Sequence, residues 1–551
     1  MRVTCARGHR FSVILCAAAL IAAVPEAGAQ GTAVIAASHP IYTDIERLSE
    51  LGLLDSVIIG QRPYSIREIA RITSAARARL QRREGNAPSA PTAEHAVLDR
   101  LRAELAEVEA QEGVQTVLTG WSLSASSTDA DRRSFSRPNN KPAEATIDPL
   151  ADRRLGTPVA RGQSLWLEAE HRFEPTPWAA LQVRERVDFG VHTPGNGRDA
   201  AGELLVAAAR LRYRNAALTA GRQQFTWTQS AGDGFFLASD APALDQVSLT
   251  GDHPFLLPGF LEHLGPTQAT LVIADLGASV VRSHSKLLTY KVSVQPSNAV
   301  EIGGTFMNHY GGEGGRSSSL GNHIIDFLPF LDVFRTHNYY DSTRTLDVNS
   351  DKLLGTDARV RLDRVGGVLL TGEVLIDDFD PRRVRQLLTS YGSQMVTMTI
   401  PRIGSPAVSL KLAAKHMGIL TYTHGSLANG IASRGRLLGD ELGPDAKSYS
   451  ATLRMEPSRK LETEIEVRSS TYSDADYIAF YADTSLKVYV IRKVAKRPDE
   501  LRELAMGRAL FRLNEAYALS GRAGLERTRN IYAAGGRRTD YVIALALRAR
   551  I

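Results

Sequence analysis

Cysteine is nearly absent from this sequence. Its two cysteines, Cys5 and Cys16, both lie close to the N-terminus, so the remaining chain can form no internal disulfide bond. Small exported domains without a sufficient core depend on disulfides, whereas a large core or a closed, hydrogen-bonded barrel does not need them. The absence therefore excludes a disulfide scaffold and is compatible with a large barrel, although soluble repeat proteins share it.

Long apolar runs are scarce as well. The run over residues 11–24 follows the basic residues Arg2, Arg7 and Arg10 and precedes the small residues 27–29. A basic start, a short apolar stretch and a small-residue cleavage site are typical of a secretory signal peptide. We therefore predict that residues 1–29 are removed on export. Because no other run reaches the roughly 18 residues of a membrane helix, the mature chain can span a membrane only as a β-barrel.

A strong excess of one charge is also missing. The formal net charge is +6, from 66 Lys and Arg against 60 Asp and Glu. This mild basic balance is compatible with anionic polymers or lipid headgroups, but it shows no concentrated basic patch of the kind that binds nucleic acid. We predict no nucleic-acid partner.

Sequence motifs for catalysis and for metal or cofactor binding are missing too. The chain has no GxSxG, GxxxxGK or HExxH motif, and its 13 histidines are dispersed. His309, His323 and His337 lie within or beside one long loop, without the spacing of a metal site. We predict a non-enzymatic protein with no cofactor and no metal. The alternative is a surface glycan hydrolase or lyase that uses the acidic cluster of Asp377, Asp378 and Asp380, although solvated loop acids explain that cluster better.

The first part of the mature chain has a helical pattern. Apolar residues recur every three to four positions in three segments, and Thr43 with Glu46 and Ser65 with Glu68 fit capping boxes. We predict a small α-helical domain over residues 30–113. A cap or plug that packs on the next domain is a better interpretation of it than an independent binding module.

After Gly113 the pattern changes to strands. Leu461, Thr463, Ile465 and Val467 alternate with Glu462, Glu464, Glu466 and Arg468, which predicts a strand with one apolar and one charged face. Long loops alternate with short turns along the chain, as in outer-membrane barrels. We predict a mainly β fold, an antiparallel outer-membrane β-barrel of about 18 strands over residues 114–551 with a polar lumen. An even strand count returns the C-terminus to the periplasmic side, where the helices lie.

Some boundaries follow from the same pattern. The first strands are predicted at residues 114–126, 161–173, 178–190, 205–213 and 216–227. A short turn is predicted at Ser520 and Gly521. The long loop at 472–506 contains a strand-like stretch, 485–494, and a helix-like stretch, 499–505, so it can fold back or plug the pore. The apolar run at 324–334 is predicted to form a short helix at the barrel rim or in the lumen.

Four stretches carry a resemblance to a known family. They read YTDIERLSELGLLDSVIIGQRPYSIREIARI, GRQQFTWTQSAGDGFFLASDAPALDQVSL, IGGTFMNHYGGEGG and TYTHGSLANGIASRGRLLGDELGPDA. In this order they resemble the Wzi-like capsule assembly family over nearly the whole mature chain. One departure follows Trp227, where the family often has Gly-Pro-Gly-like residues and this chain has TQSAG.

The resemblance implies an outer-membrane barrel with a periplasmic helical bundle. It implies that the chain binds capsular or exopolysaccharide in a lectin-like way and anchors it at the cell surface. Polysaccharide and outer-membrane lipid are then the expected partners, and we expect a monomer. The alternative function is an outer-membrane channel for the passage of solute or polysaccharide.

Carbohydrate binding needs aromatic faces for sugar rings and polar side chains for hydroxyl groups. Candidates of both kinds lie in the aromatic-rich stretch after residue 202 and in later loops: Arg222, Trp227, Asp233, Asp240, Tyr310, Tyr339, Tyr340, Tyr422 and His424. The alternative for each is an aromatic at the membrane interface or a residue that packs a loop. Arginine would also suit an acidic polysaccharide through charge-assisted hydrogen bonds.

Overall fold

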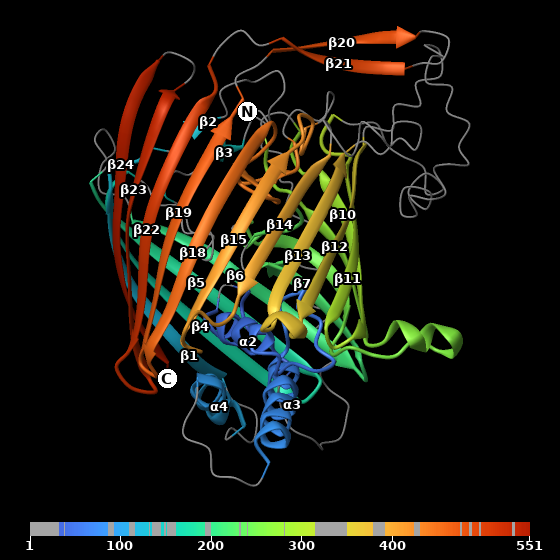
Figure 1. The fold of residues 1–551 in the computed structure, drawn as a ribbon, viewed down its shortest axis with the longest axis vertical. Coiled ribbons are helices and arrows are strands. Elements are labelled where there is room, and N and C mark those ends of the chain that lie inside the picture. The colour runs from blue at the N-terminus through green and yellow to red at the C-terminus, as the bar shows by residue number, and fades with distance from the viewer. Residues whose placement is uncertain are drawn as a thin grey trace, which may run out of the picture.

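The chain forms a closed β-barrel with helices at one end (Figure 1). The computed structural model describes residues 32–550 apart from 38, 86–92, 110–115, 132, 135–144, 148–149, 151–160, 193–199, 231–232, 240, 280–281, 315–349, 378–391, 424–429, 474–475, 484–487, 495–497 and 532–534. No helix in these described ranges has the length and the hydropathy that crossing a membrane requires.

The barrel wall is one antiparallel sheet of 18 strands. In order these are β1 (Thr116–Thr128), β4 (Gly162–Thr176), β5 (Ala179–His192), β6 (Ala200–Tyr213), β7 (Ala216–Gln223), β8 (Leu244–Gly251), β9 (Thr267–Asp275), β10 (Lys286–Ser297), β11 (Val300–Tyr310), β12 (Ser350–Leu362), β13 (Val368–Asp377), β14 (Ser393–Ile400), β15 (Val408–Met417), β18 (Ala446–Ser458), β19 (Leu461–Tyr472), β22 (Glu500–Arg512), β23 (Tyr517–Ile531) and β24 (Gly536–Arg550). Each strand pairs with the next in this order, and β24 pairs with β1, which closes the sheet. The predicted strand number and antiparallel order are confirmed.

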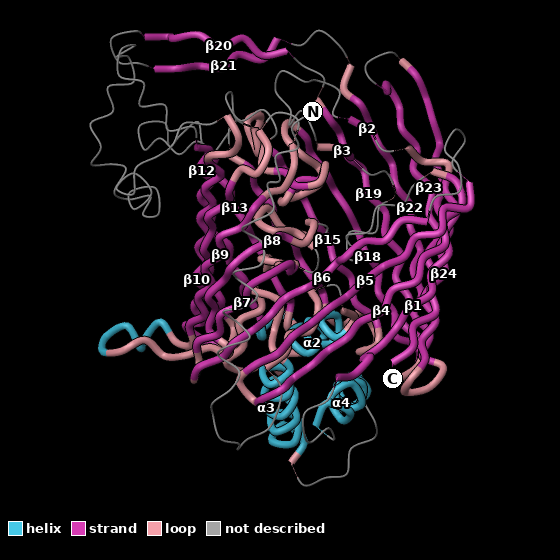
Figure 2. Tube along the Cα trace, turned by 180° about the vertical axis from the view of Figure 1, so that it is seen from behind, coloured by secondary structure: helices cyan, strands magenta, loops and turns pink. Residues whose placement is uncertain are grey.

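Three small antiparallel sheets in the described residues are not part of the wall. They are β2 (Arg133–Ser134) with β3 (Thr146–Ile147), β16 (Ala432–Ser433) with β17 (Arg436–Leu437), and β20 (Asp476–Asp483) with β21 (Val488–Val494). Residues 488–494 of the strand-like stretch predicted at 485–494 form β21, one strand of a hairpin that projects from the far end of the barrel (Figures 1 and 2).

Most wall strands present a mainly apolar face outward and a mainly polar face to the lumen. In β24, Ile543 and Leu545 point outward and are 55% and 56% exposed, whereas Asp540 points to the opposite face, toward the lumen, and is 1% exposed. Exposed aromatic residues gather near both ends: Tyr213, Phe511 and Tyr517 at the helical end, and Phe189, Tyr449 and Tyr541 at the opposite end. An apolar belt between two aromatic rows is the outer surface of a membrane-spanning barrel.

The helices are α2 (Ile41–Glu50), α3 (Ile66–Glu84) and α4 (Ala93–Glu109), and they lie at one mouth of the barrel (Figure 2). Their apolar stripes form one core, which includes Ile45, Leu48, Ile69, Val97 and Leu101. The capping box predicted at Ser65 is confirmed for the hydroxyl, whose Oγ accepts a hydrogen bond from Glu68 N at 3.2 Å, whereas the Glu68 carboxylate binds Arg71. The predicted cap at Thr43 is wrong: α2 begins earlier, after Pro40, and that end has no side-chain cap.

Ion pairs and hydrogen bonds join this helical core to the barrel wall. Arg47 donates to the carbonyl oxygen of Pro401 at 3.0 Å, and Arg550 at the end of β24 donates to that of Ala103 at 2.6 Å. The amides of Ile59 and Gly60 both donate to the buried carboxylate of Glu301 on β11, at 2.8 and 2.9 Å. The helical segment is therefore fixed to the lumen face of the barrel as well as to its rim.

Other predicted boundaries are wrong. Ser520 and Gly521 lie inside β23, and residues 500–505 belong to β22 instead of a helix. The strand predicted at 216–227 ends at Gln223, because the chain then turns into the lumen. The helix predicted at 324–334 lies outside the described residues.

The two faces of β24 generate a stability prediction. Leu545 lies midway between Tyr541 at one aromatic row and Ala549, which pairs with Tyr517 at the other. An arginine there would place its charge near the bilayer midplane, so Leu545→Arg is expected to lower the free energy of unfolding by about 2–4 kcal/mol in urea titrations in lipid vesicles. Thr539→Arg, on the same face beyond Tyr541, should lower it by about 0–1 kcal/mol. Equal losses for the two variants would contradict this position of the belt.

Candidate functional site

A segment of the chain folds back into the lumen between β7 and β8. We call residues 224–243 the inner segment. Its aromatic residues Trp227, Phe235 and Phe236 are each at most 1% exposed. They pack with apolar lumen residues of the wall such as Leu287 and Leu375, in a core that is separate from the helical one. On this side of the lumen the described residues form a packed interior. Aromatic side chains occupy the space that water fills in an open pore.

The described residues of a second loop, 418–423 and 430–445, pack on the inner segment. Tyr422 is fully buried, and its hydroxyl donates to the carbonyl oxygen of Phe235 at 2.8 Å while it accepts from Asp440 N at 3.0 Å. The amide of Tyr422 donates to Asp377 at 2.7 Å. The Tyr422 side chain thus joins the two inward-folded loops and its amide joins them to the wall.

Buried charges fix both loops to the wall. Asp233 pairs with Lys411 at 2.8 Å and with Lys415 at 2.6 Å, both on β15, and Lys415 also pairs with Asp440. Gln229 donates to Glu301 and to Asp357 at 2.7 Å each, and Asp357 pairs with the fully buried Lys291. These charges are stable in the interior because each meets an opposite charge or a donor.

The structure places the predicted carbohydrate contacts in different surroundings. Trp227, Asp233 and Tyr422 lie together in the packed interior, and Tyr310 is the half-buried last residue of β11. Arg222 lies apart from them, where it forms a bidentate pair with Asp245 at 2.7 Å on the outward side of β7 and β8. Asp240, Tyr339, Tyr340 and His424 are outside the described residues. A glycan contact at these nine positions stays a prediction.

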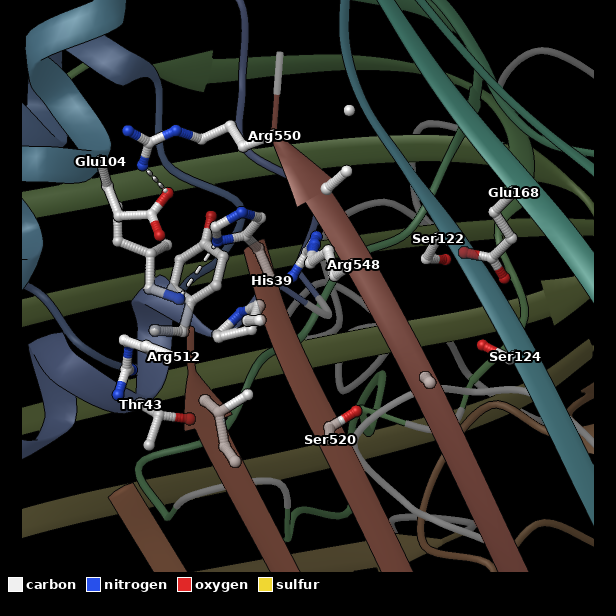
Figure 3. Close-up of a pocket in the computed structure, with 18 of the residues that line it drawn as sticks. His39, Thr43, Glu104, Ser122, Ser124, Glu168, Arg512, Ser520, Arg548 and Arg550 are labelled. Atoms are coloured by element: carbon white, nitrogen blue, oxygen red, sulfur yellow. Dashed lines mark hydrogen bonds and ion pairs between the residues drawn. The ribbon is translucent and has the colours of Figure 1, made fainter. Parts of the chain in front are cut away.

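The other side of the lumen holds a cavity of about 420 Å³ (Figure 3). It lies between α2 and the wall formed by β1, β4, β22, β23 and β24. The register explains the space: Ser124 on β1 stands opposite Ala546 on β24, which in turn stands opposite Ser520 on β23. Small side chains on three neighbouring strands leave a hollow that larger ones would fill. Its volume lies in the range of about 300–1,000 Å³ that is usual for ligand sites.

The cavity combines an aromatic ring with many hydrogen-bonding groups. Trp166 on β4 faces it from the position opposite Ser124, and Glu168 lies opposite Ser122. Most of its arginines are paired, such as Arg184 with Glu168 at 2.5 Å and Arg550 with Glu104 at 3.0 Å. An aromatic face beside hydroxyls, carboxylates and guanidinium groups is chemically suited to a sugar. Sequence reasoning did not select Trp166 or Arg548, yet alternation puts Trp166, Glu168 and Glu170 on one face of β4.

Within the described residues, no group of three or more His, Asp or Glu side chains is arranged to hold a metal ion. The charged groups described above pair with one another instead. Together, the fold and the lumen define the class of this protein: a membrane-type β-barrel whose own chain occupies much of its interior.

Comparison with known proteins identifies the family. The family model described as "Capsule assembly protein Wzi" matches residues 136–539, and the chain therefore belongs to this family. The family is one of capsule assembly proteins and not of enzymes, as the sequence predicted. A search of curated protein sequences finds no significant match.

Among the solved structures compared with this chain, that of Wzi shares the fold. The structure of Wzi from Escherichia coli, described as an outer-membrane protein involved in group 1 capsule assembly and a carbohydrate-binding β-barrel, has a TM-score of 0.65 at 13% identity and covers 94% of this chain and 99% of its own. OprD of Pseudomonas aeruginosa has a TM-score of 0.43 at 8% identity, with 80% and 97% of the two chains covered. OccK11 of the same organism has a TM-score of 0.42 at 10% identity, with 80% and 98% covered.

The Lys415 cluster generates a second prediction. The side chains of Lys415 and Asp440 are 4% and 3% exposed, so Lys415→Met leaves Asp440 as a buried charge without this counter-ion. Breaking a buried pair in this way is expected to reduce the local opening free energy of both inward loops by about 3–5 kcal/mol, measured by amide hydrogen exchange. The double variant Lys415→Met/Asp440→Asn should recover part of the loss. A double variant as unstable as the sum of its single changes would contradict the pairing.

Proposed function

We propose that this chain binds capsular or exopolysaccharide at the outer face of the outer membrane and retains it on the cell. Membership of the capsule assembly family carries the proposal. The Wzi relative that shares the fold is described as carbohydrate-binding, which supports the same role here.

The position of the chain in the membrane is part of the proposal. Residues 1–29 are a cleaved signal peptide, residues 30–113 form a periplasmic helical domain, and residues 114–551 form the barrel. The helical end then faces the periplasm, and the opposite end, with the hairpin of β20 and β21, faces the outside. The protein acts as a monomer.

The predicted contact residues take two roles in this proposal. Arg222, Tyr310 and the four positions outside the described residues, Asp240, Tyr339, Tyr340 and His424, are proposed to meet the polysaccharide directly. Trp227, Asp233 and Tyr422 are proposed to contribute by holding the loops beneath it, since the side chains of Asp233 and Tyr422 bond within the interior and the ring of Trp227 packs there.

The packing of the lumen supports the retention of polysaccharide at the surface more than the passage of solute or polysaccharide through the barrel. A channel for solute or polysaccharide needs a continuous water-filled path, whereas the inner segment fills one side of the lumen with Trp227 and Phe235, both fully buried. The helical core lies across the mouth of the barrel on the other side of this segment. Two backbone hydrogen bonds join the helical core to the inner segment: Arg62 N donates to the carbonyl oxygen of Thr226 at 3.0 Å, and Thr226 N donates to that of Arg62 at 3.1 Å.

The experiment that tests the role compares cells with and without this gene. Surface polysaccharide is divided into cell-bound and shed fractions, and each is quantified with the total. We expect the bound fraction to fall and the shed fraction to rise while the total stays level, with recovery on complementation by the wild-type gene. An unchanged partition would contradict retention, and a fall in the total would indicate a role in synthesis or export.

A further inference from the structure

A segment outside the barrel wall gathers exposed apolar side chains. Between β8 and β9 the chain leaves the wall at the helical end and projects sideways, carrying the 3₁₀ helix η3 (Gly259–Leu264) (Figures 1 and 2). We call residues 253–266 the projection. No residue of η3 is buried, and Leu256, Phe260 and Leu264 are 63%, 81% and 38% exposed. Large apolar side chains on one exposed element mark a surface that another apolar phase covers.

The length and the composition of this connection also set it apart. The other connections between neighbouring wall strands at the helical end have two to seven residues, whereas the one between β8 and β9 runs from 252 to 266. Short turns are the rule at the periplasmic end of outer-membrane barrels, so chain reversal alone does not explain the extra length. The projection reads HPFLLPGFLEHLGP, with six Phe and Leu residues and one acid, Glu262. The added residues are therefore mainly apolar.

Hydrogen bonds at the base of the projection fix its backbone to the wall. Phe255 and Thr267 form an antiparallel bridge, in which each amide donates to the carbonyl oxygen of the other, at 2.9 and 2.8 Å. Asn215, in the β6–β7 turn, bonds the backbone of His253 twice: its Nδ2 donates to the carbonyl oxygen at 2.9 Å and its Oδ1 accepts from the amide at 3.0 Å. The direction in which the projection leaves the wall is thus set by the neighbouring turn as well as by its own strands.

The pairing register places the projection at the level of the aromatic row of the helical end. Tyr213 of β6 pairs with Ala216 of β7, which pairs with Gly251 at the end of β8. Tyr213 belongs to that aromatic row, and Val247 and Leu249, earlier on β8, are exposed residues of the apolar belt. The projection therefore leaves the wall where the belt ends, at the level of the membrane interface. Its apolar surface is continuous with the surface that the barrel presents to lipid.

We propose that the projection lies in the bilayer interface at the helical end, with Leu256, Phe260 and Leu264 inserted among the phospholipid acyl chains. Elements that lie in the plane of the interface bind a membrane through the apolar area that they bury there. Interfacial anchors help to set the tilt of a membrane-spanning protein. The projection would act as a lateral anchor that holds the barrel at one depth and tilt. This inference rests on the barrel and is independent of any polysaccharide.

Fluorescence quenching in lipid vesicles tests the anchor on the full chain. The predicted mature chain has no cysteine of its own, so a single introduced cysteine takes one environment-sensitive dye. The dye is attached to Phe260→Cys, and the protein is inserted into phosphatidylcholine vesicles with brominated acyl chains. Val247→Cys, in the belt, is the reference for lipid, and Ser297→Cys, in the exposed β10–β11 turn at the same end, is the matched control for water.

We expect strong quenching at position 247, which shows that the barrel is inserted, and at least about twofold stronger quenching at position 260 than at 297. A second variant separates the projection from the dye that it carries. Leu256→Ser/Leu264→Ser, introduced into the labelled Phe260→Cys chain, should reduce the quenching toward the value at 297, because the projection then loses its other two exposed leucines.

Three results would overturn the anchor. With position 247 strongly quenched, quenching at 260 as weak as at 297 would place the projection in water. Energy transfer between copies labelled at 260, without quenching by lipid, would place a second copy of the chain on this surface. Quenching at 260 that Leu256→Ser/Leu264→Ser leaves unchanged would show that the dye, and not the projection, binds the lipid.

Discussion

The central constraint on this molecule is that many strands of the wall turn charged side chains toward an enclosed space. The outward face meets lipid over most of its height, so most acids and bases of these strands face the lumen. A buried charge without a partner is costly, and a lumen that excludes water must supply counter-charges from the protein itself. Lys291 with Asp357 and Lys415 with Asp440 satisfy this requirement between strands or between a strand and an inward loop.

The two segments that fill the lumen depend on the same charges. Glu301 accepts hydrogen bonds from Ile59 and Gly60 of the helical segment and from Gln229 of the inner segment. One carboxylate therefore fixes both to the wall. The wall, the helical core and the inner segment form one connected interior, and a cavity remains beside β1, β4 and β24. A barrel arranged in this way is better suited to hold a polymer at its surface than to conduct one.

Local patterns predicted the wall because the membrane imposes a strict period of two. Leu461 to Arg468 alternate cleanly, and the loop lengths alternate with them. The period of two is harder to recognise where charged and apolar residues share the lumen face of a strand. Glu500, Arg502 and Leu504 all face inward in β22, and this stretch was predicted to be helical. In the same way, Ser520 and Gly521 were predicted to form a turn, although a strand accepts them where the lumen is hollow.

The interior could not be predicted because its contacts are distant in sequence. Nothing near Asp233 indicates that its partners are Lys411 and Lys415, and nothing near Trp227 shows that its ring is buried. Aromatic and polar residues in a Gly-rich loop are expected equally in a sugar site and in a packed plug. The cavity depends on the alignment of Ser124, Ala546 and Ser520 across three strands, which only the closed register brings together.

The measurement that tests this account most directly is the conductance of the purified, full-length protein in planar lipid bilayers. If helical core and inner segment together close the lumen, correctly folded protein should insert without steady, stepwise ion current. Removal of the inner segment, with Gln223 and Leu244 joined by a short glycine linker, should raise the frequency and size of current steps in proportion to the space it vacates. A stable open conductance from the intact chain would contradict a closed barrel and would favour a channel.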